Sequence, residues 1–121
     1  MKVVKHYRWH WGTLAYAFHR VSGLALIAYL PTHIWVMHYL RHGAGDFDAA
    51  MRFLNQPLFK LAEVALFGAI IYHALNGLRV VAVDLGLADR LADQKRWFWA
   101  VLAVSGAASA VVGLALMRHA M

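Results

Sequence analysis

The sequence predicts an all-α membrane protein in which 121 residues form a single domain with three transmembrane helices. Hydrophobic residues make up 62% of the chain and charged residues only 15%, a balance too apolar for an ordinary soluble domain. The apolar residues are also concentrated in three segments, at 21–39, 61–78 and 97–117. The last segment contains no charged residue, and a helix of that length rises about 30 Å, enough to cross the hydrocarbon core.

The segments between these apolar stretches indicate where each helix begins and ends. The N-terminal residues mix basic and aromatic side chains, as in a segment at a membrane interface, and they lack the features of a removable signal peptide. Pro57 suits the first turn of a helix. The predicted elements are an interfacial segment at 1–13, helices at about 14–41, 57–84 and 95–119, a short amphipathic stretch at 47–56 and a loop at 86–94.

The distribution of charge predicts the orientation of the chain. A formal net charge of +6 could indicate a nucleic-acid-binding protein, but the basic residues lie at the ends of the apolar segments, where they contact lipid headgroups. We therefore expect no nucleic-acid partner. Eight of the twelve basic residues lie on the side of the N-terminus and the second loop, namely Lys2, Lys5, Arg8, Arg20, Arg79, Arg90, Lys95 and Arg96. The positive-inside rule then places the N-terminus in the cytoplasm and the C-terminus outside.

Ionisable residues inside a membrane are costly and are candidates for function, and the first of them is His73. It lies about two turns inside one end of the helix at 57–84, and Gly77 follows one turn later on the same face, where a flat macrocycle could approach the backbone. A neutral imidazole is the usual nitrogen ligand of haem iron, and Arg79 could pair with the haem propionates. The alternative is a histidine that hydrogen-bonds a neighbouring helix while Arg79 extends to the interface. Spacing alone leaves both interpretations open.

A second candidate is the pair formed by His19 and Arg20, at the membrane entry of the helix at 14–41. These side chains could hold anionic propionates or hydrogen-bond a quinone carbonyl. Interfacial anchoring is the alternative, and it is favoured when the pair is considered alone.

His33 is the third candidate, because it lies deep in the same helix. It follows Arg20 by 13 residues, which corresponds to roughly 20 Å, whereas His73 lies about 9 Å below Arg79. The two histidines therefore differ in depth by on the order of 10 Å, as two haems stacked across the membrane would require. His38 is a weaker alternative ligand nearer the outer surface.

Two motifs resemble the signatures of a known family, the succinate dehydrogenase cytochrome b subunit. The sequence HRVSG at 19–23 is similar to the family's H-R-x-[ST]-G signature. The sequence HALNGLR at 73–79, followed by Asp84, is similar to its H-x-x-x-G-x-R…D signature. The order of the motifs and the three-helix layout agree over roughly residues 11–117.

The resemblance implies that the chain is half of a heterodimeric haem-binding helix bundle. In this family the histidine matching His73 is an axial ligand of haem b, and a second membrane subunit supplies the opposite ligand. The histidine matching His19 contacts a propionate, and the arginine matching Arg20 borders the haem and the quinone site. Members with two haems have a histidine ten residues after the first glycine, which is His33 after Gly23. We therefore expect two haems, with metal ligands His73 and His33.

The resemblance also implies a role in succinate dehydrogenase, the complex II of respiration and the tricarboxylic acid cycle, in a bacterial inner membrane. A flavoprotein subunit with FAD would oxidise succinate to fumarate, and an iron–sulfur subunit would pass electrons to ubiquinone or menaquinone. The present chain has no cysteine, so it holds no iron–sulfur cluster itself. It would anchor these subunits in the lipid and catalyse nothing alone.

The finer site assignments follow from the same resemblance, with two departures. Arg20, with Tyr16 and Ser22, would line the quinone site, and Arg79 would join His19 and Arg20 as a propionate partner. Many relatives have a serine at the position of Tyr16 and a histidine at the position of Val80. Both departures concern the quinone and propionate contacts and leave the assignment of His73 unchanged.

Three alternatives remain open from the sequence. The chain could anchor a fumarate reductase that runs the reverse reaction. It could be a self-contained haem b electron-transfer protein, although His33 and His73 differ too much in depth to share one iron. It could also be a structural membrane module whose histidines form interhelical hydrogen bonds.

Overall fold

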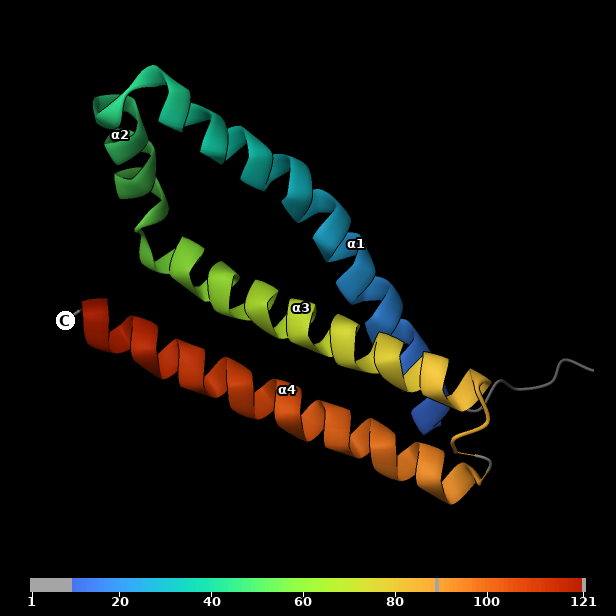
Figure 1. Ribbon diagram of the computed structural model, residues 1–121. Coiled ribbons are helices and arrows are strands. Elements are labelled where there is room, and N and C mark those ends of the chain that lie inside the picture. The colour runs from blue at the N-terminus through green and yellow to red at the C-terminus, as the bar shows by residue number, and fades with distance from the viewer. Residues whose placement is uncertain (1–9, 89, 121) are drawn as a thin grey trace, which may run out of the picture.

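The computed structural model describes residues 10–88 and 90–120, and in this part of the chain all regular structure is helical. The three long helices alternate in direction, and a short helix joins the first to the second (Figure 1). The elements are α1 (Trp11–His38), the 3₁₀ helix η1 (Tyr39–His42), α2 (Ala44–Leu54), α3 (Pro57–Asp84) and α4 (Leu91–Ala120). Most of the predicted interfacial segment, residues 1–9, lies outside the described residues.

The prediction of an all-α protein with three membrane-crossing helices is confirmed. Three helical stretches are long and apolar enough to span a bilayer, at Trp11–His42, Pro57–Asp84 and Leu91–His119. The first end of the bundle, as we call it, contains the start of α1, the end of α3 and the start of α4 (Figure 1). The far end contains η1, α2 and the end of α4.

Two helix starts differ from the predicted positions for local reasons. The helix α1 begins at Trp11 because the Nδ1 atom of His10 accepts a hydrogen bond of 3.0 Å from the backbone N–H of Gly12, which caps the first turn. The helix α4 begins at Leu91, inside the predicted loop, and Asp93 in its first turn complements the positive end of the helix dipole. Both helices are therefore extended at the first end of the bundle.

The helices α3 and α4 pack along most of their length through small residues. A Cβ atom on Gly68 would lie only 2.6 Å from the Oγ atom of Ser109, and one on Gly113 would lie 3.7 Å from Val64. The Ser109 hydroxyl is satisfied within its own helix, since it donates to the carbonyl of Ser105 at 2.8 Å. Small side chains at such positions let two membrane helices approach closely, which explains the tight hairpin.

A small aromatic core fixes α1 against this hairpin at the first end. Ala15, Tyr72 and Phe98 are buried there, and Trp11 packs against them from α1. The Tyr72 hydroxyl donates a hydrogen bond of 3.0 Å to the carbonyl of Ala15. Through this contact, a buried polar group satisfies a backbone acceptor on the neighbouring helix.

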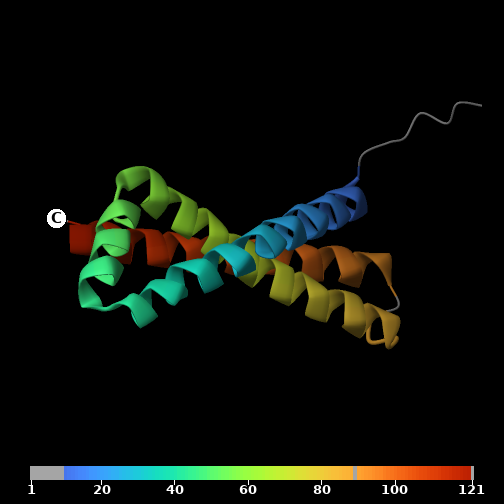
Figure 2. The same cartoon turned by 90° about the horizontal axis from the view of Figure 1, so that it is seen from above.

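Beyond this core α1 crosses α3 and diverges from it. The two views agree that the helices separate toward the far end, where η1 and α2 bridge them (Figure 1, Figure 2). Large apolar side chains on this part of α1 are exposed, with Ile34 at 68% and Trp35 at 65%. The far half of α1 thus offers its surface to lipid or to a partner chain.

Candidate functional site

Two histidines from different helices meet where α1 crosses α3. The rings of His19 and His73 are stacked, with centroids 4.1 Å apart and planes inclined by 13°. Both side chains are partly buried, and both lie inside candidate membrane spans. The structure therefore brings together one residue from each of the two sequence motifs.

Each histidine ring lies over a glycine of the opposite helix. A Cβ atom on Gly23 would be 3.1 Å from the Cε1 atom of His73, and one on Gly77 would be 3.7 Å from the Cε1 atom of His19. Each helix carries a histidine followed by glycine four residues later, on the same face. Two antiparallel copies of this spacing pack reciprocally, a relationship that the sequence analysis missed although the repeated spacing signals it.

The Nδ1 atom of His73 is held by α1. It lies 3.1 Å from the Oγ atom of Ser22 and 3.2 Å from the carbonyl oxygen of His19. The Ser22 hydroxyl donates to the same carbonyl at 2.9 Å, and the residue is only 5% exposed. Ser22 is therefore part of the histidine cluster.

His19 contributes a polar atom that has no partner within the described part of the chain. Its Nδ1 atom is buried and makes no hydrogen bond with any residue in the described ranges. Buried nitrogen atoms of this kind are nearly always paired in folded proteins. This atom is therefore a candidate contact for a ligand.

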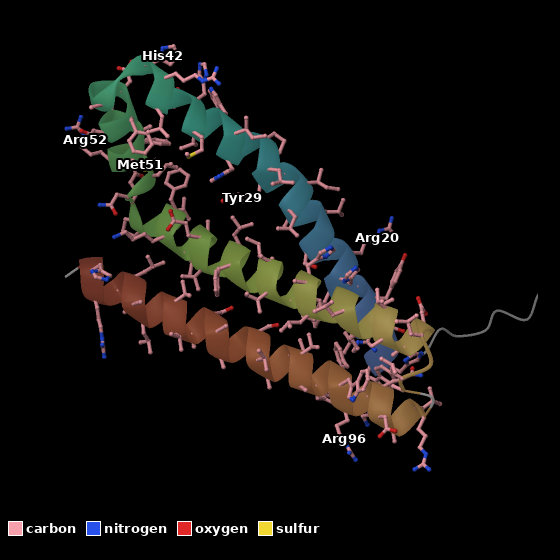
Figure 3. The ribbon with its side chains drawn as sticks, viewed as in Figure 1. Arg20, Tyr29, His42, Met51, Arg52 and Arg96 are labelled. Atoms are coloured by element: carbon pink, nitrogen blue, oxygen red, sulfur yellow. The ribbon has the colours of Figure 1, made fainter. Side chains whose placement is uncertain are left out.

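Arg20 lies on another face of α1 from Ser22. Its side chain extends away from α3 (Figure 3), and its Nη1 atom donates a hydrogen bond of 3.4 Å to the Tyr16 hydroxyl. Both Arg20 and Tyr16 are exposed. The structure thus groups two of the three predicted quinone residues and separates them from the third.

Arg79 lies at the interface of α3 and α4. Its Nε atom donates a hydrogen bond of 2.9 Å to the Oδ1 atom of Asn76, which is 1% exposed. Its guanidinium carbon lies 6.0 Å from the centroid of the Phe98 ring, within the range of a cation–π contact. Asn76 and Phe98, which the sequence analysis did not single out, therefore orient this cation. The sequence could have indicated the contact between Asn76 and Arg79, because residues one helical turn apart lie close enough for their side chains to interact.

His33 is separate from this cluster, on the exposed far half of α1. Its Nδ1 atom lies 3.0 Å from the hydroxyl of Tyr29, one turn earlier, and Figure 3 shows Tyr29 on the side of α1 turned toward α3. The alternative residue His38 lies nearer the far end, where its Nε2 atom is 2.8 Å from the Nε2 atom of His42. The Nε2 atom of His38 is therefore engaged, whereas that of His33 makes no hydrogen bond to the residues described.

Steric contact at Gly23 leads to a stability prediction. The variant Gly23→Val should push the His73 ring off Ser22 and lower the free energy of unfolding by about 1–3 kcal/mol, as overpacking does. The measurement is the loss of helical circular dichroism of the purified protein against increasing SDS. The matched control is Gly106→Val, because a Cβ atom on Gly106 would meet no atom within 4 Å. Equal unfolding midpoints for the two variants would contradict the prediction.

Comparison with known proteins is consistent with the two motifs. Residues 2–112 match the model of the succinate dehydrogenase/fumarate reductase transmembrane subunit family. The chain is 35% identical to the succinate dehydrogenase hydrophobic membrane anchor subunit of Halobacterium salinarum, over 78% of the chain and 72% of that protein. It is 28% identical to the succinate dehydrogenase 2 membrane subunit SdhC of Mycobacterium tuberculosis, over 93% and 85%. It is also 27% identical to the succinate dehydrogenase cytochrome b556 subunit of Coxiella burnetii, over 79% and 78%.

Proposed function

Because the chain belongs to the succinate dehydrogenase/fumarate reductase transmembrane subunit family, we propose that it binds haem b and helps to form the quinone site of a succinate:quinone oxidoreductase. As a multi-pass membrane protein of this family, it would anchor the soluble subunits. The stacked pair of His19 and His73 is the observation that supports this function most directly.

The residues around His73 suit a haem. The Nδ1 atom of this histidine is held by Ser22 and the His19 carbonyl, which leaves Nε2 as the ring nitrogen for iron. The buried Nδ1 atom of His19 has no hydrogen-bond partner among the residues that the structure describes and could donate to a propionate. No three potential metal-binding side chains converge in residues 10–88 and 90–120, whereas haem needs only one axial ligand from each chain. When bound, haem b would supply a one-electron carrier beside the quinone site.

A second haem nearer the far end would be held by His33. This histidine also has its Nδ1 atom beside a hydroxyl, that of Tyr29, and its Nε2 atom faces no hydrogen-bonding group among the described residues. It is exposed within this chain, as a ligand to a group shared with a second membrane subunit would be. Each iron would take its opposite axial ligand from that subunit.

The quinone would contact the exposed face that carries Arg20 and Tyr16. The Arg20 guanidinium is a donor for a quinone carbonyl, and its contact with the Tyr16 hydroxyl keeps both groups near the first end. We place this end at the cytoplasmic surface of a bacterial inner membrane, because most of the basic residues flank it. The iron–sulfur subunit and the FAD-containing flavoprotein would dock there.

The variant Arg20→Gln tests the quinone part of this function. Removing a charged donor to the quinone carbonyl costs about 1.5–3 kcal/mol, so succinate:quinone reductase activity of the assembled complex should fall by roughly tenfold to a hundredfold. Reduction of a soluble artificial acceptor by the same complex should not change, because the flavoprotein catalyses that reaction. Arg118→Gln is the matched control, since this exposed arginine lies in the last turn of α4. Wild-type quinone reduction by the Arg20→Gln complex would exclude Arg20 from the quinone site.

A further inference from the structure

We propose that Ser22 is a positioning residue that, together with the carbonyl of His19, fixes His73 as the tautomer with its proton on Nδ1. The Nε2 lone pair is then free to bind iron before any haem arrives. This inference rests on the proposed haem-binding function. It gives Ser22 a role other than the predicted quinone contact.

The preferred tautomer of His73 follows from the hydrogen-bond donors and acceptors around its Nδ1 atom. Three polar atoms converge there, with distances of 3.1 Å from Nδ1 of His73 to Oγ of Ser22, 3.2 Å from Nδ1 to the His19 oxygen and 2.9 Å from Oγ to that oxygen. The carbonyl oxygen can only accept, and the hydroxyl has one proton, which it donates to the carbonyl. A proton on Nδ1 gives every close contact a donor.

The opposite tautomer leaves this arrangement unsatisfied. With Nδ1 deprotonated, the serine proton could satisfy either the ring nitrogen or the carbonyl of His19, and these two acceptors would face each other at 3.2 Å. Ser22 is 5% exposed, so water could not readily compensate. Leaving a buried acceptor unpaired is costly, which strongly favours the proton on Nδ1.

Packing prevents the ring from escaping this constraint by rotation. One face of the His73 ring is stacked on His19, and its Cε1 edge lies against the backbone at Gly23. A flip that exchanged Nδ1 for a carbon would remove both hydrogen bonds to α1. The ring is therefore held in orientation as well as in tautomer.

The same contacts argue against a quinone role for Ser22. Its single proton is donated to the His19 carbonyl, so it has none to offer a quinone oxygen. It is also buried on the face of α1 toward α3, whereas Arg20 extends away from α3 (Figure 3). Acceptors around the Nδ1 proton increase the electron donation of a histidine ligand, so Ser22 should lower the reduction potential of the haem at His73, which we call the proximal haem.

The test compares Ser22→Ala, Ser22→Thr and Ser109→Ala in the assembled complex. Threonine keeps a hydroxyl at the same position, and Ser109 donates to its own helix away from the histidines. The readouts are haem content per flavin, the midpoint potential of the proximal haem and its low-spin electron paramagnetic resonance signal, which reports the orientation of the axial ligands. We expect Ser22→Ala to raise the potential and shift the signal, while Ser22→Thr and Ser109→Ala match wild type.

Each outcome of this experiment either supports or overturns the positioning role of Ser22. Loss of the proximal haem in Ser22→Ala but not in Ser22→Thr would also support the proposal, because only the hydroxyl distinguishes them. An unchanged potential and signal in Ser22→Ala, or the same change in Ser22→Thr, would overturn it while leaving the haem-binding function intact. Failure of that function is seen separately, as a wild-type complex without haem or a His73→Ala complex that keeps its full haem content.

Discussion

Replacing His73 with alanine should halve the haem content of the assembled complex, from two haems per flavin to one. The variant removes the imidazole whose Nε2 atom we assign to the iron, since its Nδ1 atom is held by α1, and a methyl group cannot ligate a metal. The pyridine haemochrome spectrum gives the haem, and flavin fluorescence gives the amount of complex. Flavin and iron–sulfur content should stay at the wild-type level, because the change lies inside the membrane-spanning helix α3 and leaves the surface at the first end, where the soluble subunits would dock, unaltered.

A histidine outside the bundle core provides the control for this experiment. His119 is exposed in the last turn of α4, so His119→Ala should keep both haems. Two haems per flavin in the His73→Ala complex would remove His73 from the ligands. No haem in the wild-type complex would leave the chain as an anchor without a cofactor.

Replacing His33 with alanine should remove the other haem and leave the one at His73 in place. The two positions are independent because His33 lies on the far half of α1, outside the stacked pair, and contacts Tyr29 of its own helix. The reduced-minus-oxidised spectrum should lose one component, and a double variant with His73→Ala should contain no haem.

The matched control here is His38→Ala. His38 is one and a half turns further along the same helix, and its Nε2 atom is paired with His42. We therefore expect this variant to keep two haems. Retention of both haems in His33→Ala, together with loss of one in His38→Ala, would assign the second haem to His38 and not to His33.

Most of the fold could be predicted because its determinants are local. A run without charged residues, such as 97–117, needs no knowledge of its neighbours to be identified as a membrane-spanning helix. The start of α4 could not be placed as well, because residues 91–94 (LADQ) mix apolar with polar side chains and yet are compatible with a helix, with Asp93 stabilising the first turn. The divergence of α1 from α3 also lay beyond the sequence, since it depends on packing between helices.

The candidate site could also be predicted only in part from the sequence. His19 and His73 were identified from their cost inside a membrane and from their motifs, but their stacking on each other's glycines required the crossing point of two helices. The separation of Ser22 from Arg20 was partly predictable, because two residues along a helix correspond to a rotation of about 200°. The hydrogen bonds that Ser22 makes were not, since its partner on α3 is 51 positions away in the chain.

Because α1 diverges from α3, part of its surface would be uncovered in a chain that has not yet met its partner subunits. Within the part of the chain that the structure describes, the buried aromatic residues that join α1 to the α3–α4 hairpin lie at the first end of the bundle, so little packing would hold the far half of α1 in a newly inserted chain. That half would expose apolar side chains and an intramembrane histidine until a second subunit covers them. An unassembled copy would thus present an apolar, histidine-bearing surface that is covered in an assembled one.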